Sequence, residues 1–206
     1  KPGLIITKYD EQTHEVLPDV TFEIYRDTVL ISSFSTDEMG QIRLTDLQPG
    51  TYLVKEVSTS AGYVLDSTPV KFKVDGSAEV VVVEKYNQPQ MGTITILKRG
   101  EVFSTVNEQD GIYTPHYEMQ GLTGAVFGVY AVEDTYTLDG TKRYSAGEKV
   151  ATLTTAADGT ATSEPLFLGK FELREEKAPY GMVLLKEPVQ TELTYAGEQV
   201  KITTVS

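Results

Sequence analysis

The sequence predicts an all-β protein built from two tandem β-sandwich domains. Short segments rich in Val, Ile, Thr, Tyr and Phe alternate with Gly, Pro, Asp and Ser along the whole chain, and no stretch keeps a helical period over three turns. This alternation is typical of a β-sandwich. Several motifs also return in the same order in the second half, which indicates two copies of one unit. We place the domains at residues 1–88 and 91–206, joined by a short polar linker.

Strands in the first half are expected at a spacing that fits one small sandwich. They cover residues 4–9, 20–26, 30–35, 41–44, 50–57, 70–74 and 79–86. Between them lie Gly, Pro, Asp and Ser, the residues that turns favour.

The second half repeats three landmarks of the first half in the same order. The matching pairs are 17–25 (LPDVTFEIY) with 122–130 (LTGAVFGVY), 35–40 (STDEMG) with 154–159 (TTAADG), and 50–56 (GTYLVKE) with 169–175 (GKFELRE). Such self-similarity over the whole length indicates tandem copies.

The second copy is longer than the first because it carries inserts at residues 100–121 and 133–148. The first insert contains Tyr113, His116 and Tyr117. Loops inserted on a rigid scaffold often carry binding function, but long surface insertions are also tolerated at small energetic cost. The insert therefore has two interpretations, a ligand-binding loop or a decoration without function.

The composition excludes several classes of function. With 40% hydrophobic and 23% charged residues, the chain is too apolar for intrinsic disorder. Its net charge of −12 repels nucleic acid and anionic membranes, so neither is expected as a partner. The absence of cysteine excludes disulfides, thiolate metal sites and thiol catalysis. His14 and His116 are isolated, so we expect no metal site and no cofactor.

The chain shows no targeting or anchoring signal. It contains no apolar run of roughly 18 residues, the length that suggests a membrane-spanning helix. It also shows no secretory signal peptide and no sorting signal of the LPxTG type. The chain begins on a strand-like segment, as a fragment of a longer protein would.

A glutamate is repeated on the core-facing side of one strand. Successive side chains of a strand point to opposite faces, so Glu56 shares a face with Tyr52 and Val54. Glu175 occupies the same place in the second copy. Because burying an unpaired charge is costly, each glutamate is expected to be neutral or to have a dedicated partner.

A lysine is repeated in the same manner on the first strand of each copy. Lys8 shares a face with Ile6, and Lys98 shares a face with Ile96. A lone lysine at a strand end is commonly a snorkelling side chain whose amine reaches water. The occurrence of the same lysine and glutamate in both copies favours a paired site in the core.

Asn87 adds a third polar group in the first copy, directly after the apolar strand that is expected to close the sandwich. In a dry core, burial lowers the pKa of Lys8 and raises the pKa of Glu56, which leaves a neutral amine and a carboxylic acid. The amine is then able to attack the side-chain carbonyl of Asn87 while Glu56 hydrogen-bonds that carbonyl and shuttles protons. Ammonia leaves, and an isopeptide bond joins the first strand to the last.

These motifs resemble the B-type repeat of collagen-adhesin (CnaB) and SpaA-like pilin proteins on Gram-positive bacteria. The resemblance rests on segments 7–10 (TKYD), 17–25, 46–56 (DLQPGTYLVKE) and 61–63 (AGY) in the first copy and 173–181 (LREEKAPYG) in the second. It implies an immunoglobulin-like or prealbumin-like β-sandwich, a cell-wall-anchored parent protein, and a Lys-Asn isopeptide crosslink assisted by a glutamate. By position, these roles fall on Lys8, Asn87 and Glu56 and, in the second copy, on Lys98 and Glu175.

The second copy departs from this pattern at the acceptor. No Asn or Asp follows Asp158, so the usual acceptor at the end of the last strand, residues 199–206, is missing. Either the acceptor lies beyond Ser206 in the parent protein, or the second copy forms no crosslink.

The sequence therefore predicts structural stalk or shaft modules of an extracellular, cell-wall-anchored adhesin or pilus subunit. Its expected partners are the neighbouring domains of a longer surface protein. Because the chemistry happens once within the molecule, we expect no enzyme with turnover. Two alternatives stay open. The insert of the second copy could bind a host extracellular-matrix protein or glycan, or the fragment could be an accessory domain of a secreted enzyme.

Overall fold

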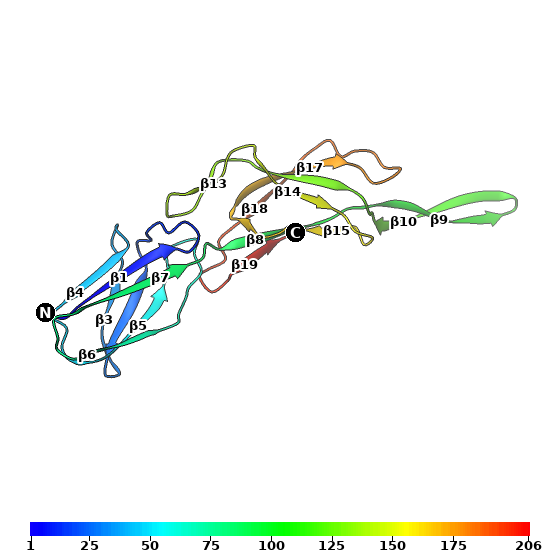
Figure 1. Cartoon of the computed structure of the whole chain (residues 1–206). Coiled ribbons are helices and arrows are strands. Elements are labelled where there is room, and N and C mark those ends of the chain that lie inside the picture. The colour runs from blue at the N-terminus through cyan, green and yellow to red at the C-terminus, as the bar shows by residue number, and fades with distance from the viewer. The chain divides into compact units, whose positions relative to one another are not determined.

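The computed structural model describes residues 1–206, and every regular element in it is a β-strand (Figure 1). The chain divides into two compact units. Unit 1 comprises Lys1–Gln90, Tyr136–Arg143 and Tyr195–Lys201, and unit 2 comprises Met91–Thr135, Tyr144–Thr194 and Ile202–Ser206. No helix of the structure has the length and apolar character that crossing a membrane requires.

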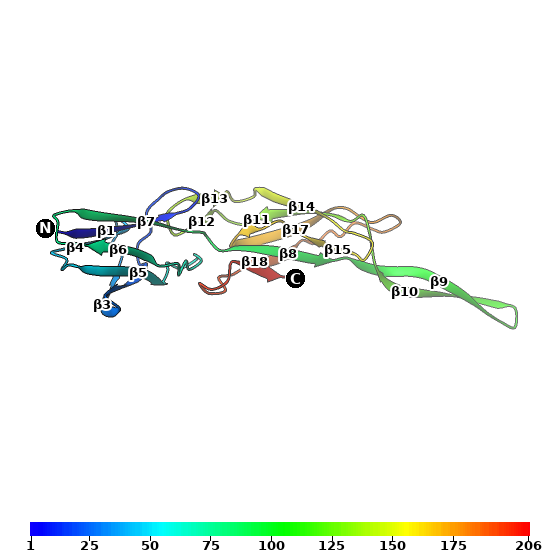
Figure 2. The same cartoon turned by 60° about the horizontal axis from the view of Figure 1, so that its bottom comes forward.

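Unit 1 is a sandwich of two sheets, which Figure 2 shows as separate layers. Its strands are β1 (Gly3–Asp10), β2 (Thr21–Arg26), β3 (Val29–Ser35), β4 (Gln41–Thr45), β5 (Gly50–Ser58), β6 (Val70–Val74) and β7 (Val80–Asn87). The sheets have the strand orders β4-β1-β7 and β3-β2-β5-β6. The strands expected in the first half are thus confirmed, and no strand end differs from the expected one by more than one residue.

The first and last strands of unit 1 lie side by side. β1 pairs with β7 in parallel, and the register sets Lys8 opposite Lys85 and Asp10 opposite Asn87. Alternate residues of both strands face inward, where Leu4, Ile6 and others form the hydrophobic core between the sheets. This pairing brings the end of the expected closing strand next to the end of the first strand.

Unit 2 repeats this arrangement. Its strands are β8 (Met91–Leu97), β9 (Arg99–Gln109), β10 (Ile112–Gly121), β11 (Val126–Ala131), β14 (Lys149–Thr154), β15 (Thr160–Thr162), β16 (Leu166–Phe167), β17 (Gly169–Lys177), β18 (Val189–Leu193) and β19 (Ile202–Val205). One sheet has the order β14-β11-β17-β18, and in the other β8 pairs with β15, β16 and β19. The β8–β19 pair is parallel, like β1–β7 in unit 1.

Equivalent hydrogen bonds confirm the internal repeat. The amide N–H of Lys8 donates to the carbonyl of Gly40, and the amide N–H of Lys98 donates to the carbonyl of Gly159. The hydroxyl of the buried Thr36 accepts from the amide N–H of Val20 and donates to the carbonyl of Leu17. In unit 2 the hydroxyl of Thr155 makes the same two contacts, with Ala125 and Leu122. The sequence motifs that led to the tandem-domain prediction therefore hold equivalent positions in the two units.

The first insert of the second copy is a hairpin, which corrects the expectation of a loop. β9 and β10 pair along nearly their whole length and extend away from the other strands of unit 2 (Figure 1). Tyr113, His116 and Tyr117 accordingly lie in a strand, β10. The turn at its tip is made by Asp110 and Gly111, with φ angles of 54° and 76°.

Two short strands come from the second insert. They are β12 (Thr135–Tyr136) and β13 (Lys142–Tyr144), which pair with each other.

Candidate functional site

Lys8 is buried because it occupies one of the inward-facing positions that alternate along β1. Leu4, Ile6 and Lys8 face inward from this strand, and all three side chains have no exposed surface. The amine of Lys8 therefore ends inside the sandwich and does not reach water as a snorkelling lysine would. It must find its polar partners within the core.

Glu56 on β5 and Asn87 at the end of β7 are those partners. The Lys8 Nζ donates to Asn87 Oδ1 at 2.7 Å and lies 3.3 Å from Glu56 Oε1. The Asn87 Nδ2 donates to the same Glu56 oxygen at 2.7 Å. Glu56 is fully buried, and Asn87 is 1% exposed. The three side chains that the sequence singled out thus form one contiguous, buried cluster.

One detail of the hypothesis needs correction. The sequence argument had Glu56 hydrogen-bonding the carbonyl of Asn87, whereas the structure has the carbonyl bonded to Lys8 and the amide nitrogen bonded to Glu56. The carboxyl group therefore lies beside the nitrogen that would depart as ammonia. This position suits a group that delivers a proton to the leaving nitrogen.

Burial shifts the pKa of both ionisable groups toward their neutral forms. Desolvation lowers the pKa of Lys8 to about 8, although the nearby Glu56 opposes the shift. Desolvation also raises the pKa of Glu56, against the opposing effects of Lys8 and of the hydrogen bonds it accepts. A neutral amine is a nucleophile and a protonated carboxyl is a proton donor, so these are the forms that amide attack needs.

A second lysine supports the cluster, and the sequence analysis missed it. The backbone N–H of Asp66 donates to Glu56 Oε2 at 2.8 Å. The Asp66 side chain is held by Lys85, whose Nζ lies 3.1 Å from Asp66 Oδ2 and donates to the carbonyl of Thr68 at 2.9 Å. Lys85 lies two residues before Asn87, so strand alternation alone places it on the same inward face.

A cavity of about 470 Å³ borders the cluster in unit 1. Its lining includes Val64, Asp66, Lys85 and Asn87.

Unit 2 brings together Lys98 and Glu175 but no third partner. The Lys98 Nζ lies 3.1 Å from Glu175 Oε1. The amide N–H of Leu185 donates to the other oxygen of Glu175, as Asp66 does to Glu56 in unit 1. Glu175 Oε1 is buried and has no hydrogen-bond partner beyond this ion pair. β19 pairs with β8 only as far as Val205 opposite Ile94, so no amide side chain reaches the site.

Asp10 in unit 1 is a further buried carboxylate that the sequence analysis missed. It accepts hydrogen bonds from the Tyr63 hydroxyl at 2.7 Å and from Arg143 Nη2 at 2.9 Å. Burial and the nearby Asp10 raise the pKa of Tyr63. Strand alternation places Asp10 inward beside Lys8, but its arginine lies far along the chain, in segment Tyr136–Arg143.

The hairpin of unit 2 presents a second candidate site. Tyr113, Tyr117 and Met119 alternate along β10 on one face, and Phe103 lies opposite Tyr117 on β9. Tyr113 is 71% exposed and Tyr117 58% exposed. Phe103 and Tyr117 meet edge to face, with ring centroids 6.2 Å apart. His116 points to the other face, where it contacts Asn107.

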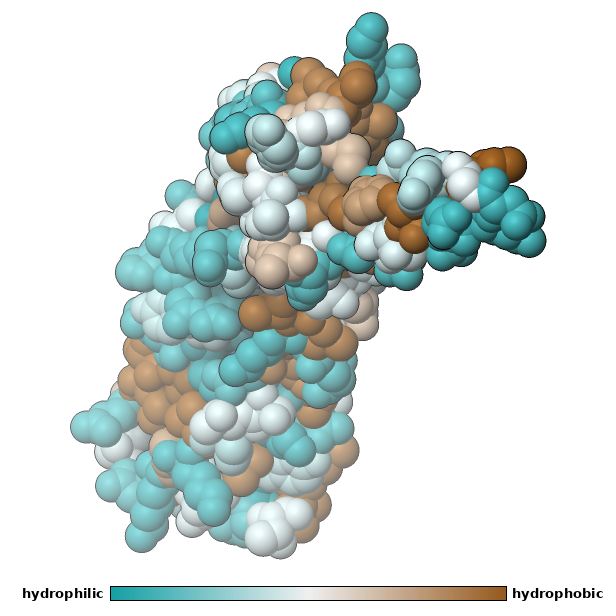
Figure 3. All heavy atoms as spheres, turned by 90° about the vertical axis from the view of Figure 1, so that its right-hand side faces the viewer, coloured by the Kyte–Doolittle hydropathy of each residue, from teal (hydrophilic) through white to brown (hydrophobic).

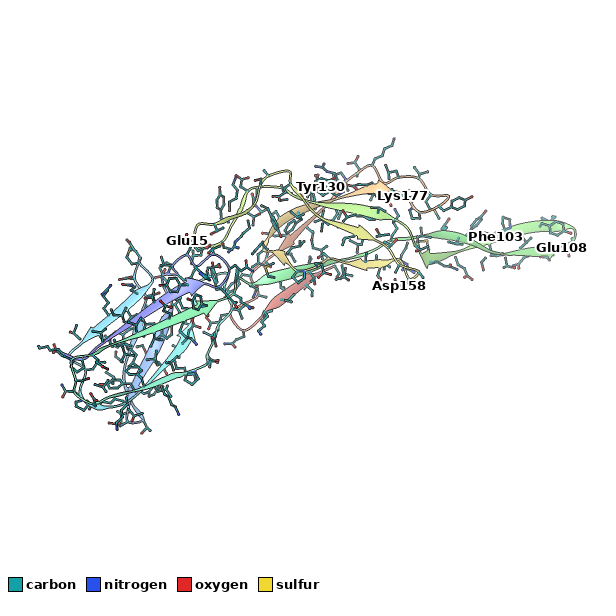
Figure 4. All side chains as sticks on the ribbon, in the orientation of Figure 1. Glu15, Phe103, Glu108, Tyr130, Asp158 and Lys177 are labelled. Atoms are coloured by element: carbon teal, nitrogen blue, oxygen red, sulfur yellow. The ribbon has the colours of Figure 1, made fainter.

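The figures place this surface. Figure 4 labels Phe103 and Glu108 on the part of the hairpin that extends away from the other strands of unit 2. Figure 3 looks from the side on which the hairpin projects and shows hydrophobic patches among hydrophilic ones.

Solved structures match nearly the whole chain. The Bacillus anthracis TIE protein is 26% identical, matches 99% of this chain and has a TM-score of 0.66, but this chain spans only 33% of that chain. A streptococcal ancillary pilin is 23% identical, with 98% of this chain and 61% of that chain covered and a TM-score of 0.40. A shaft pilin, SpaA from Lactobacillus rhamnosus GG, is 13% identical over 98% and 95% of the two chains, with a TM-score of 0.40.

A comparison with curated proteins finds no match. A family model, by contrast, covers most of the chain. The SpaA prealbumin-like fold domain matches residues 2–89 and again residues 116–206, one match in each copy of the repeat. The residues between the two matches comprise β8, Lys98, β9 and the start of β10, so the candidate lysine of unit 2 lies outside the matched residues. This chain therefore belongs to the SpaA family of prealbumin-like fold domains, of which it contains two in tandem.

Proposed function

We propose that this chain forms structural stalk or shaft modules of a cell-wall-anchored adhesin or pilus subunit, and that unit 1 is locked by an intramolecular isopeptide bond between Lys8 and Asn87. The domain boundaries that we propose are 1–88 and 91–206. The parent protein is extracellular, and the partners of these modules are its neighbouring domains. The observation that carries the proposal is the buried contact of Lys8 with Asn87 at 2.7 Å.

The reaction balances within the protein. The neutral amine of Lys8 attacks Cγ of Asn87, and the new N–C bond replaces the bond from Cγ to Nδ2. One proton of the amine passes through Glu56 to the departing nitrogen, which leaves as ammonia with its own two protons and this third one. The reaction consumes Lys8 and Asn87 of the same molecule, so it occurs once and the protein has no enzymatic turnover.

The proposed role is mechanical and thermodynamic. The bond closes a loop across the 79 positions that separate Lys8 from Asn87. By chain entropy alone, a covalent link over a loop of this length stabilises the fold by about 4 to 5 kcal/mol. It also ties β1 to β7, so tension applied to the ends of unit 1 passes through the bond and leaves the strands between them unloaded.

The intact mass of the purified protein tests this proposal. We expect a mass about 17 Da below the sequence mass, and proteolysis should yield a branched peptide that joins Lys8 to Asn87. The Lys8→Ala and Asn87→Ala variants should have their full sequence masses. A wild-type protein at its full sequence mass would contradict the proposal.

A second candidate function is ligand binding by the hairpin of unit 2. Its support is the exposed aromatic face, since exposed apolar surface on a small projecting element commonly marks a contact site. The partner class that we propose is a host extracellular-matrix protein or glycan. Immobilised collagen, fibronectin and a glycan array are suitable probes. The double variant Tyr113→Ser, Tyr117→Ser should abolish binding, whereas Thr114→Ser on the opposite face should not. Equal binding by both variants would contradict this role.

A further inference from the structure

Thr59 touches the nitrogen that the proposed reaction expels. The Asn87 Nδ2 has two protons, of which one is donated to Glu56 Oε1 and the other to Thr59 Oγ1, each at 2.7 Å. With its oxygen bonded to Lys8, the Asn87 amide has a partner for every polar atom. These three hydrogen bonds therefore fix the plane of the amide.

A bulge in β5 brings Thr59 to this place. Phe22 of β2 lies opposite Glu56 and Thr21 lies opposite Ser58, so Val57 has no partner across the pair. An extra residue of this kind bends the strand and re-aims the side chains that follow. Regular alternation from Glu56 would instead point the side chain three residues later to the outer face.

We propose that Thr59 is a catalytic residue of the crosslinking reaction in unit 1, where its hydroxyl oxygen holds the departing nitrogen of Asn87. This inference rests on the proposed function. As Lys8 adds to Cγ, the bond from Cγ to Nδ2 lengthens, and the nitrogen accepts a proton from Glu56. Throughout, an N–H of this nitrogen donates to Thr59, so the leaving group stays aligned until it departs as ammonia. A hydrogen bond held in place before the reaction costs no reorganisation during it.

Unit 2 provides an internal comparison on the same scaffold. There too a bulge follows the glutamate: Phe127 lies opposite Glu175 and Val126 lies opposite Lys177. The residue three positions after Glu175 is Ala178, which has no hydroxyl. In unit 2 no amide side chain is hydrogen-bonded at the Lys98–Glu175 pair, so there is no leaving nitrogen to hold there. In this chain the hydroxyl is thus present in unit 1, which has the asparagine acceptor, and absent from unit 2, which lacks one. Unit 2 also shows that the scaffold tolerates alanine at this position.

The test compares two substitutions that separate the hydroxyl from the shape of the side chain. Thr59→Val keeps the shape and loses the hydroxyl, whereas Thr59→Ser keeps the hydroxyl and loses the methyl group. Thr51→Val, at an exposed position of β5, the strand that ends just before Thr59, is the matched control. Each chain is isolated unfolded from inclusion bodies and diluted from urea at pH 7.5. Loss of 17 Da is followed by mass spectrometry, and folding of the same samples by tyrosine fluorescence.

We expect Thr59→Val to slow ammonia loss at least about tenfold after folding is complete, which corresponds to one lost transition-state contact. Thr59→Ser and Thr51→Val should react at close to the wild-type rate. If Thr59→Val does not fold, Thr59→Ala replaces it, since unit 2 carries alanine there. If Thr59→Val or Thr59→Ala loses ammonia as fast as the wild-type protein does, the role of Thr59 is refuted and the proposed function stands. Wild-type protein that folds without losing ammonia would overturn the proposed function itself.

Discussion

At the scale of single residues, the crosslinking reaction that we propose for unit 1 depends on the protonation state of Lys8. Burial lowers the pKa of Lys8 to about 8. At pH 7 about a tenth of such amines are neutral, compared with about 0.03% for an ordinary lysine with a pKa of 10.5. Desolvation therefore supplies roughly 300 times more nucleophile without any change of side chain.

The rate of crosslinking should consequently depend on pH. The neutral amine and the protonated carboxyl of Glu56 together hold one proton more than the fully deprotonated pair, as the ion pair of these two side chains also does. Between the raised pKa of Glu56 and the pKa of Lys8, which is about 8, the rate of ammonia loss should therefore stay nearly constant, and above about pH 8 it should fall about tenfold for each pH unit because the pair loses this proton. Refolding the urea-unfolded chain over a range of pH values on both sides of 8 and following the mass would measure this profile. A rate that keeps rising above pH 8 would show that the protonated carboxyl is not required.

Removing the proton carrier should separate the contact from the reaction. In Glu56→Gln, Lys8 and Asn87 should still meet, but ammonia loss should be slowed by at least about a hundredfold, since general acid–base groups typically contribute 10²–10⁴-fold. The measurement is intact mass after days of incubation. Full crosslinking of this variant at the wild-type rate would refute a proton-transfer role for Glu56.

Gly40 holds the lysine strand through a turn that only glycine fits. Its φ is +69°, and a Cβ there would lie 2.8 Å from the Cβ of Val16 and 3.0 Å from the carbonyl oxygen of Lys8. Gly40→Ala should therefore destabilise unit 1 by about 2 to 3 kcal/mol, from backbone strain plus the clash.

Gly62→Ala is the matched control for that substitution. Gly62 has a φ of +85° but nothing within 4 Å of its Cβ position, so only strain of about 1 kcal/mol remains. Both variants should be compared by urea unfolding in an Asn87→Ala background, where no crosslink masks the difference. Equal destabilisation would show that the clash is relieved.

At the scale of elements, strand alternation was sufficient to identify the three central residues. Lys8 and Glu56 repeat at inward positions in both copies, and Asn87 ends the closing strand, so the period of two already places them together. Thr59 was not predictable, because a bulge without a sequence signature shifts the alternation after Glu56. Arg143 was not predictable either, since its partner Asp10 is 133 positions away.

The hairpin, by contrast, had a signal that was missed. Asp110-Gly111 is a dipeptide that favours a tight turn with two positive φ angles, which is how both residues are found. Charged and polar residues around this turn gave the segment the character of a loop. The alternation of Tyr113, Tyr117 and Met119 would have marked β10 as a strand with one apolar face.

The hairpin should be dispensable for the fold of unit 2. The hydrophobic core cluster of this unit contains no residue of β9 or β10. Replacing residues 102–119 by a short Gly-Ser turn should therefore change the free energy of unfolding of unit 2 by less than about 1 kcal/mol. Urea unfolding followed by circular dichroism would measure this. Loss of cooperative unfolding would show that the hairpin stabilises the sandwich.

Unit 2 should remain uncrosslinked within residues 1–206. Its lysine and glutamate are in place, but the register of β19 would set an acceptor opposite Gly100, a position that Ile202–Val205 does not reach. The mass deficit should thus be about 17 Da and not about 34 Da. The Lys98→Met variant should show the same single mass deficit as the wild-type protein. A deficit smaller than that of the wild-type protein would reveal an unrecognised acceptor for Lys98.

At the scale of the whole molecule, the two units should respond differently to force. In a single-molecule pulling experiment, the crosslink should hide the residues between Lys8 and Asn87 from extension. In Asn87→Ala, where the crosslink is unable to form, unfolding of unit 1 should release about 79 residues, a gain of roughly 26 to 28 nm in contour length at 3.3 to 3.6 Å per residue. The same gain in wild-type molecules would show that no covalent bond carries the force between Lys8 and Asn87.

The parallel pairing of β1 with β7 has a consequence for the history of each molecule. The two reacting side chains are 79 positions apart in the chain and become neighbours only when the sandwich has closed. Denaturation after the proposed crosslinking would disorder the strands but would not restore the lost ammonia. The mass of an unfolded chain would then report whether that chain had ever been folded.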